Sequence, residues 1–124
     1  MLVKNLKVLH MEKPLAIDVV PYFSWMMESD IPNTMQESYQ LTIKDTAGNC
    51  IYDSGVVESS SNAYIPYKGA KLQSKMRYLW TVRVSDNHGN TATATSSFET
   101  GLLSESDWSA KWVNYDLYLH LRLL

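Results

Sequence analysis

The chain has 124 residues, of which 45% are hydrophobic and 19% are charged, and this length suits one globular domain with a buried core. Its 11 basic and 13 acidic residues are spread along the sequence and give a formal net charge of -2, which argues against nucleic acid or an anionic membrane surface as the main partner. A single cysteine excludes an internal disulfide, so we expect packing to stabilise the fold.

The sequence suggests no membrane span, secretion signal or metal site. No run approaches the roughly 18 consecutive apolar residues of a transmembrane helix, and strand-like sequence follows Met1 directly. The three histidines, His10, His88 and His120, lie far apart in the sequence. We therefore expect no membrane partner, a cytoplasmic location, and neither a metal nor a cofactor.

Apolar and polar residues alternate along much of the chain, which is typical of strands with one buried face. The pattern is strongest at residues 76–86, where Tyr78, Trp80 and Val82 share one side. Pro66 would fit only at a sheet edge or a strand end. Seven strands are predicted in all, and in chain order they are residues 3–9, 21–27, 36–45, 50–57, 62–67, 76–86 and 91–98.

Turn residues separate these segments. The sequence Ala-Gly-Asn at 47–49 and the sequence Asn-His-Gly-Asn at 87–90 each predict a hairpin between the flanking strands. At 53–55, Asp-Ser-Gly offers a carboxylate and a hydroxyl to nearby amides, and Gly55 permits a positive φ for a bulge or turn. Seven strands without intervening helices predict an all-β fold, an antiparallel fibronectin-III or immunoglobulin-like β-sandwich.

A tyrosine near the start of the strongest strand suggests a tyrosine corner, in which a buried ring bonds through its hydroxyl to the backbone a few residues upstream. Tyr78 has the required position, six residues after the apolar Leu72. The alternative is an ordinary half-buried strand tyrosine. The predicted structural core contains Trp25, Leu72, Tyr78, Trp80 and Phe98.

The pattern changes after residue 103. Residues 104–107, Ser-Glu-Ser-Asp, resemble a capping box, and Trp108 and Trp112 follow at helical i,i+4 spacing, so a short helical turn is predicted near 104–112. The two indoles either cover an open edge of this sandwich or form a docking surface for a neighbouring domain. We therefore divide the chain into a sandwich at 1–103 and a linker or docking segment at 104–113.

The tail at residues 114–124 alternates leucines with polar residues, which favours an extra strand over a helix. Such a strand would leave an apolar face and an unpaired edge unless it completed a sheet of its own sandwich or paired with a second copy. A homodimer through this tail is therefore a hypothesis.

Six phrases in collinear order carry a resemblance to a known family. They are Asn-Leu-Lys-Val at 5–8, Pro-Tyr-Phe-Ser-Trp at 21–25, Tyr-Asp-Ser-Gly-Val-Val at 52–57, Tyr-Leu-Trp-Thr-Val-Arg-Val at 78–84, Phe-Glu-Thr-Gly-Leu-Leu at 98–103 and Asp-Trp-Ser-Ala-Lys-Trp-Val at 107–113. Together they resemble the N-terminal fibronectin-III-like module of bacterial α-L-rhamnosidases.

In that family the module precedes further β-sandwich domains and a helical barrel, whose carboxylates cleave terminal α-L-rhamnose from glycosides. The resemblance does not extend to the barrel. It therefore implies a non-catalytic module that packs against the neighbouring domains of a parent glycoside hydrolase, and no enzymatic activity for this chain by itself.

The residues give no independent sign of catalysis. The carboxylates that could form a glycosidase pair fall in or beside turns or at strand ends, where they usually cap backbone amides; they are Glu37, Asp45, Asp53, Glu58 and Asp86. No nucleophile elbow of the Gly-x-Ser-x-Gly kind occurs. Cys50, at the opening of a strand, is interpreted as a small buried residue. The basic cluster at 68–77, with three lysines and one arginine, is interpreted as a solvated loop rather than an anion site.

Two other functions remain open. A carbohydrate-binding module would use exposed aromatic rings to stack on sugars, and the sequence offers Tyr52, Tyr64, Tyr67 and, beyond the sandwich, Trp108. A fibronectin-type protein-interaction domain would have the same fold, and no residue specifies its partner.

Overall fold

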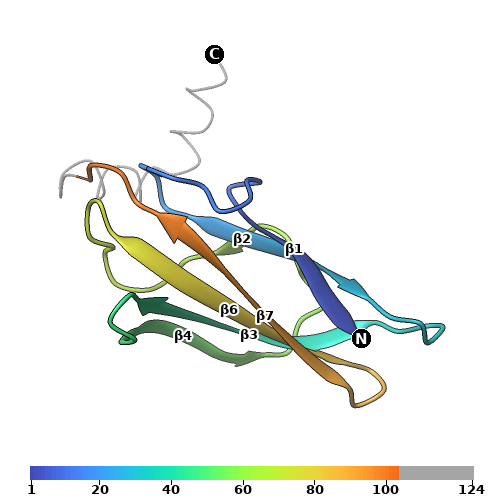
Figure 1. Ribbon diagram of the computed structural model, residues 1–124. Helices are drawn as coiled ribbons and strands as arrows, with labels where there is room; N and C mark the ends of the chain where they lie inside the picture. The colour runs from blue at the N-terminus through green and yellow to red at the C-terminus, as the bar shows by residue number, and fades with distance from the viewer. Residues whose placement is uncertain (104–124) are drawn as a thin grey trace.

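Seven strands make up the regular structure of residues 1–103, the part of the chain that this computed structural model describes (Figure 1). All strand pairs are antiparallel, as predicted for an all-β chain. In chain order the strands are β1 Leu2–Val8, β2 Tyr22–Glu28, β3 Gln36–Asp45, β4 Cys50–Val57, β5 Ile65–Pro66, β6 Arg77–Asp86 and β7 Thr91–Glu99.

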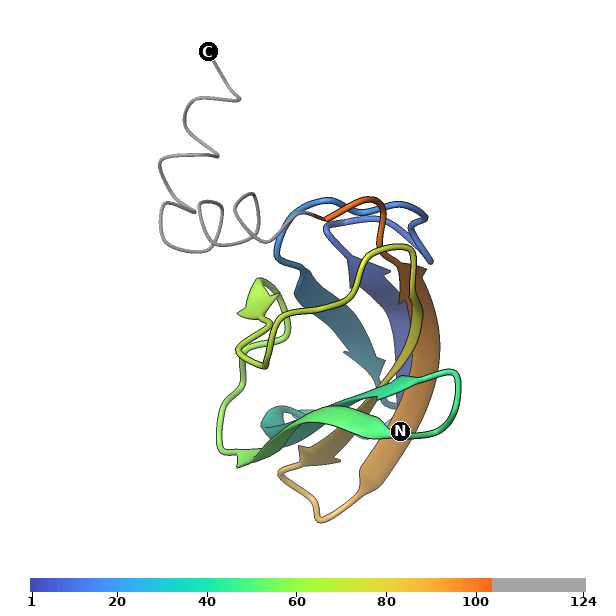
Figure 2. The same ribbon diagram turned by 90° about the vertical axis from the view of Figure 1, so that its left-hand side faces the viewer.

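The strands form two layers. One sheet has the order β1-β2-β5 and the other has the order β4-β3-β6-β7. Seen in Figure 2, β1 lies beside β7, so the two sheets meet closely along that side of the sandwich. On the opposite side, β4 and the short β5 are the edge strands of their sheets. The prediction of an immunoglobulin-like β-sandwich is confirmed.

The core lies between the sheets and is rich in aromatic rings. Phe23 of β2 contacts Trp80 of β6 with ring centroids 4.9 Å apart, and Tyr78 stacks on Phe98 of β7 at 5.3 Å. The residues assigned to the core from the sequence are all at most 3% exposed; they are Trp25, Leu72, Tyr78, Trp80 and Phe98. Each such side chain contributes about 1.5–3 kcal/mol through burial.

A buried glutamine joins three segments on the inside of the sandwich. Gln36, at the start of β3, accepts a hydrogen bond of 2.9 Å from the indole nitrogen of Trp25. Its amide nitrogen donates to the backbone oxygens of Ser59 and Ser61, in the connection between β4 and β5. Every polar atom of the Gln36 side chain is therefore satisfied, which is what a polar group at 8% exposure requires.

The two long hairpins use the same turn. In each, an aspartate at the strand end accepts backbone N–H bonds from residues two and four positions later, at 2.8–3.0 Å; these are Asp45 before β4 and Asp86 before β7. A glycine three positions after each aspartate has a positive φ, 89° at Gly48 and 83° at Gly89. The predicted hairpins are confirmed, and both carboxylates cap the turn amides.

The Asp-Ser-Gly sequence of β4 also behaves as predicted. Asp53 accepts bonds from the Gly55 amide and from the side chain of Gln40, while the Ser54 hydroxyl accepts the backbone N–H of Leu41 on β3. Gly55 has a φ of 66°, and the β3–β4 register shifts at this point. The result is a bulge on an edge strand, which discourages pairing with another chain.

Two local predictions need correction. The strand predicted at 62–67 is regular only at Ile65–Pro66, because Tyr64 has a φ of 55° and interrupts the extended chain. The segment still runs along β2 through single hydrogen bonds at Asn62 and Tyr67. Cys50 is exposed, not buried, because it opens β4 directly after the hairpin turn.

The tyrosine corner is present. The Tyr78 hydroxyl accepts a 2.9 Å hydrogen bond from the backbone N–H of Gln73, five residues upstream.

We predict that Tyr78→Phe lowers the free energy of unfolding by about 1–3 kcal/mol, because a part-buried amide loses its acceptor. Urea denaturation measures this, with Tyr64→Phe, at a ring that is 66% exposed, as the neutral control. Equal unfolding midpoints for the two variants would contradict a structural role of the hydroxyl.

The hairpin aspartates should make stability depend on pH. The hydrogen bond from the backbone amide of Asn49 lowers the pKa of Asp45. At Asp86, burial raises the pKa, but the hydrogen bonds from the amides of Asn90 and His88 outweigh this effect, so the pKa is lowered. Both groups therefore stabilise the fold above the ordinary aspartate pKa of about 3.9 and lose this contribution as the pH falls toward their lower folded values.

We expect the double variant Asp45→Asn/Asp86→Asn to be less stable at neutral pH but to lose less stability on acidification than the wild type. Urea midpoints measured from neutral to acidic pH test this. Parallel pH curves for the two proteins would show that other groups cause the acid dependence.

Candidate functional site

One end of the sandwich combines a pocket with the last described residues of the chain. We call it the exit end, and it consists of the β5–β6 loop at residues 67–76 and the segment 100–103 that comes after β7. In Figure 1 these two segments lie side by side at the upper left, next to the start of β6. Hydrogen bonds between them confirm that they are in contact.

The β5–β6 loop holds the segment 100–103 through both backbone and side chains. The Ser74 hydroxyl bonds to the carbonyl and the amide of Leu103 at 2.6 and 2.7 Å. The Lys75 amide donates to the Gly101 carbonyl, and the Thr100 amide donates to the Met76 carbonyl, both at 2.9 Å. The backbone path of the chain is therefore fixed as far as residue 103.

The connection between β1 and β2 fixes the same segment from the other side. Gly101 donates to the carbonyl of Ile17 at 2.8 Å, and Ile17 donates to the carbonyl of Glu99 at 2.9 Å, which gives a short parallel bridge. A Cβ atom on Gly101 would lie 3.0 Å from the Ala16 carbonyl oxygen, so this close approach favours glycine.

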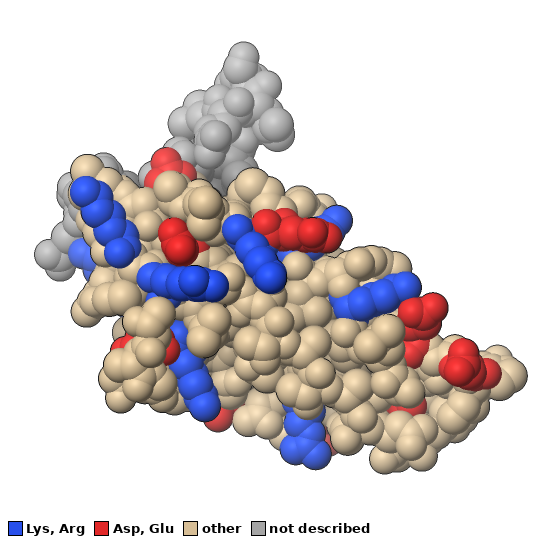
Figure 3. Space-filling model, viewed as in Figure 1, with Lys and Arg blue, Asp and Glu red and all other residues tan. Residues whose placement is uncertain are grey.

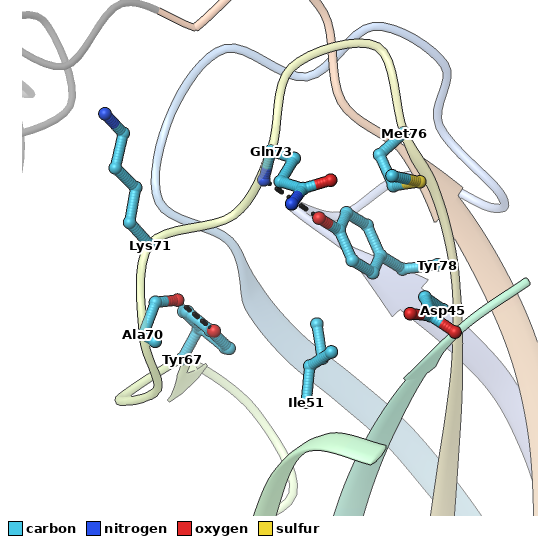
Figure 4. A pocket seen from close by; sticks show the side chains of 8 residues that line it. All are labelled: Asp45, Ile51, Tyr67, Ala70, Lys71, Gln73, Met76 and Tyr78. Carbon is cyan, nitrogen blue, oxygen red and sulfur yellow. Dashed lines mark hydrogen bonds between the residues drawn. The ribbon is translucent and has the colours of Figure 1, made fainter. Parts of the chain in front are cut away.

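Beneath the loop lies a pocket of about 300 Å³, shown in Figure 4. Two tyrosines attach the loop above it: Tyr78 accepts the Gln73 amide, and Tyr67 donates to the Ala70 carbonyl. Burial, with smaller effects of Tyr78 and Tyr52, raises the pKa of Tyr67 to about 12, so it remains a donor at physiological pH. In Figure 4 the Lys71 side chain extends away from the other residues that line the pocket.

A tyrosine pair lies beside the pocket, at the side where β4 and β5 are the edge strands. Tyr52 of β4 and Tyr67 have ring centroids 5.2 Å apart and meet edge to face. Gly69 lies against both, because a Cβ atom there would be 2.6 Å from the Tyr67 hydroxyl and 2.8 Å from the Tyr52 ring. The two tyrosines and Gly69 therefore pack closely against one another on this side of the sandwich.

The structure places the three sugar-stacking candidates differently. Tyr67 is 1% exposed and cannot present its ring to a sugar. Tyr52 is half-buried against it. Tyr64, in contrast, is 66% exposed and lies on the outer side of the β1-β2-β5 sheet with His10 and Tyr22, two residues that the sequence analysis did not select.

The docking candidates Trp108 and Trp112, the helical turn at 104–112 and the tail at 114–124 lie outside the described residues. Within residues 1–103, no group of three or more histidine, cysteine, aspartate or glutamate side chains could hold a metal ion. No helix in that part of the chain is long and apolar enough to cross a membrane.

The basic residues of the β5–β6 region are all exposed, as expected for a solvated loop; they are Lys68, Lys71, Lys75 and Arg77. On the face shown in Figure 3, lysine and arginine side chains alternate with aspartate and glutamate over the described residues. Lys4 and Glu28, for example, form an ion pair of 2.9 Å across β1 and β2. This distribution gives that face no field of a single sign.

The sequence and the fold both match known proteins. Residues 3–104 match the family described as the Rha78A-like, N-terminal immunoglobulin domain. The chain belongs to this family. A similar protein is an α-L-rhamnosidase of Streptomyces avermitilis, 38% identical over 112 residues. Another α-L-rhamnosidase, from Formosa agariphila, is 31% identical over 110 residues. The aligned regions cover 85% and 81% of this chain but only 11% and 12% of those proteins.

Solved structures agree with this family. A crystal structure of the S. avermitilis α-L-rhamnosidase in complex with L-rhamnose superposes on 86% of the chain with a TM-score of 0.76 and 35% identity. An α-L-rhamnosidase from Dictyoglumus thermophilum gives the same TM-score at 30% identity. The chain covers 11% and 13% of these two structures. This Rha78A-like domain thus spans about a tenth of the length of its relatives.

We predict that Ser74→Ala loosens the segment 100–103 without unfolding the domain, because both hydrogen bonds to Leu103 are lost. The expected result is hydrogen exchange of the Leu103 amide that is faster by about one order of magnitude, corresponding to roughly 1.4 kcal/mol of local stability. Ser38→Ala on β3 is the matched control. Ser38 pairs with Ser85 near the end of β6, whereas the exit end adjoins the start of β6, so this change should not affect Leu103. Unchanged exchange at Leu103 would show that Ser74 does not hold the segment.

Proposed function

We propose that this chain is a non-catalytic N-terminal module of a larger α-L-rhamnosidase-type glycoside hydrolase, and that its exit end is the platform on which the following domain packs. The family membership and the small share of the relatives that the chain covers support the first part. The second part rests on one observation: the segment 100–103 is bonded on two sides before the chain continues.

A fixed exit segment matters because it sets the direction in which the chain leaves the module. A flexible linker would let the next domain move freely, whereas a segment bonded to Ser74 and Ile17 transmits the orientation of the sandwich to that domain. The partly open pocket under the β5–β6 loop provides an adjacent concave surface. Trp108 and Trp112 come within ten residues of Leu103 and are the side chains that we propose for this contact.

The carboxylates of the sandwich support a non-catalytic role. Asp45 and Asp86 accept turn amides, Asp53 accepts Gly55 and Gln40, and Glu28 pairs with Lys4. Hydrogen bonds from Gln40 and from the Gly55 amide lower the pKa of Asp53, so this group is ionised at neutral pH and is not suited to donate a proton. These groups stabilise the backbone, whereas a glycosidase needs an acid and a base that face each other across a sugar.

The isolated chain should not hydrolyse an aryl α-L-rhamnoside. The control is the α-L-rhamnosidase of Streptomyces avermitilis, a much longer relative, which should be active under the same conditions. Release of the aryl group by the isolated chain, at a rate that scales with its concentration and survives further purification, would overturn the non-catalytic role.

A further inference from the structure

The outer face of the β1-β2-β5 sheet carries an aromatic cluster. His10, Tyr22 and Tyr64 contact one another, with ring centroids 5.1–5.4 Å apart in all three pairs. Tyr22 begins β2, His10 comes two residues after the end of β1, and Tyr64 directly precedes β5. Tyr64 is 66% exposed, so this cluster is not part of the core.

A groove of about 270 Å³ lies on the same face, and His10 is one of the residues that line it. Tyr64 borders the groove through its ring contact with His10. Ser24 and Met26 of β2 line it, together with Asn5 and Lys7 from β1 and with Asn62. The groove is smaller than the pockets that hold drug-sized ligands, which begin at about 300 Å³. It therefore suits one small ring rather than an extended chain.

The polar side chains of the groove have hydrogen-bonding capacity to spare. Within the described residues, no hydrogen bond or ion pair engages the side chains of Lys7, Ser24 or Asn62. The Asn5 amide donates only to the sulfur of Met26, a weak acceptor, at 3.0 Å. Two amides, a hydroxyl and an ammonium group thus line a groove that ends at an aromatic cluster.

The backbone departs from regular geometry at Asn5 of the groove and at His10 and Tyr64 of the aromatic cluster. Asn5, His10 and Tyr64 have φ values of 53°, 63° and 55°, a region that side chains other than glycine rarely adopt. Asn5 lies in a bulge, where the β1–β2 register shifts between Lys4 and Lys7. Bulges re-aim side chains, so the bulge turns the Asn5 amide toward this face. The same φ region also occurs at residues that do not line the groove, so the geometry of the groove and not the strain supports a ligand site; they are Leu9, Lys13, Ala16, Asn33 and Lys75.

We propose that this groove binds a single pyranose unit of a glycoside, with the Tyr64 ring stacked on the C–H face of the sugar and Asn5, Ser24 and Asn62 bonded to its hydroxyls. The chemistry fits a sugar because aromatic faces stack on sugar C–H groups, while amides and hydroxyls exchange hydrogen bonds with alcohols. A protein-docking surface would instead offer a large contiguous apolar patch.

The site goes beyond the proposed packing role, because it lies on the outer sheet face and does not use the pocket at the exit end. Its test is a titration of the ¹⁵N-labelled chain with L-rhamnose and with methyl α-L-rhamnoside, monitored by amide NMR shifts. We expect saturable shifts confined to the groove, with a Kd on the order of millimolar, as is usual for one small ligand with few contacts.

Three variants separate stacking from other effects. Tyr64→Ala should weaken binding at least about tenfold, because the stacking ring is lost. Tyr64→Phe should bind like the wild type, since the Tyr64 hydroxyl makes no hydrogen bond within residues 1–103. Asn62→Ala should weaken binding with an unchanged thermal midpoint. The control Val56→Ala, at an exposed position on β4, should not alter binding.

Two results would overturn the proposal. The first is an absence of saturable shifts with both sugars, or shifts that remain in Tyr64→Ala. The second is protection of His10 from diethylpyrocarbonate in the 124-residue chain without any sugar, at concentrations where it self-associates, because the face would then be an interface between copies. Neither result bears on whether the isolated chain hydrolyses rhamnosides, so the proposed function is tested separately.

Discussion

The hydrogen bond from the Gln73 amide to the Tyr78 hydroxyl fixes the loop on which the rest of the exit end depends. The chain must cross from β5 in one sheet to β6 in the other, and such a crossing has few neighbours to pair its backbone groups. Tyr78 supplies one acceptor and Tyr67 one donor, so the loop is attached at both ends of its path. Once it is attached, Ser74 can hold Leu103, and this contact sets the direction of the exit segment.

Much of this fold results from local rules in the sequence. The alternation around Trp80, the turn glycines after Asp45 and Asp86, and the spacing of Leu72 and Tyr78 each specify structure within about ten residues. That is why the strands, the hairpins and the tyrosine corner could be predicted. The resemblance of short phrases to a family added a domain context, which the alternation of residues does not contain. The order of the strands in the two sheets required the structure.

The features that could not be predicted depend on residues that are distant in the sequence. Gln36 has a polar side chain in a strand, and only the meeting of β2, β3 and the β4–β5 connection explains its burial. His10, Tyr22 and Tyr64 are separated by 12 and 42 residues along the chain, and no periodic pattern connects them. Tyr64 was selected as an exposed aromatic residue, but its φ of 55° and its two ring partners required the structure.

Two features of the outer face of the β1-β2-β5 sheet, its unpaired polar groups and its strained backbone, differ in what they cost the folded protein. Unpaired groups such as Lys7 and Ser24 on an exposed face cost little, because water satisfies them, so by themselves they say little about function. A non-glycine residue at positive φ costs about 1–3 kcal/mol, and an exposed ring recovers little of that through burial. Tyr64 and His10 both carry this cost on the outer face. Six other non-glycine residues within residues 1–103 share this backbone geometry, so strain alone does not mark a ligand site. What distinguishes Tyr64 and His10 is that their strained positions bring the two rings into contact beside a groove.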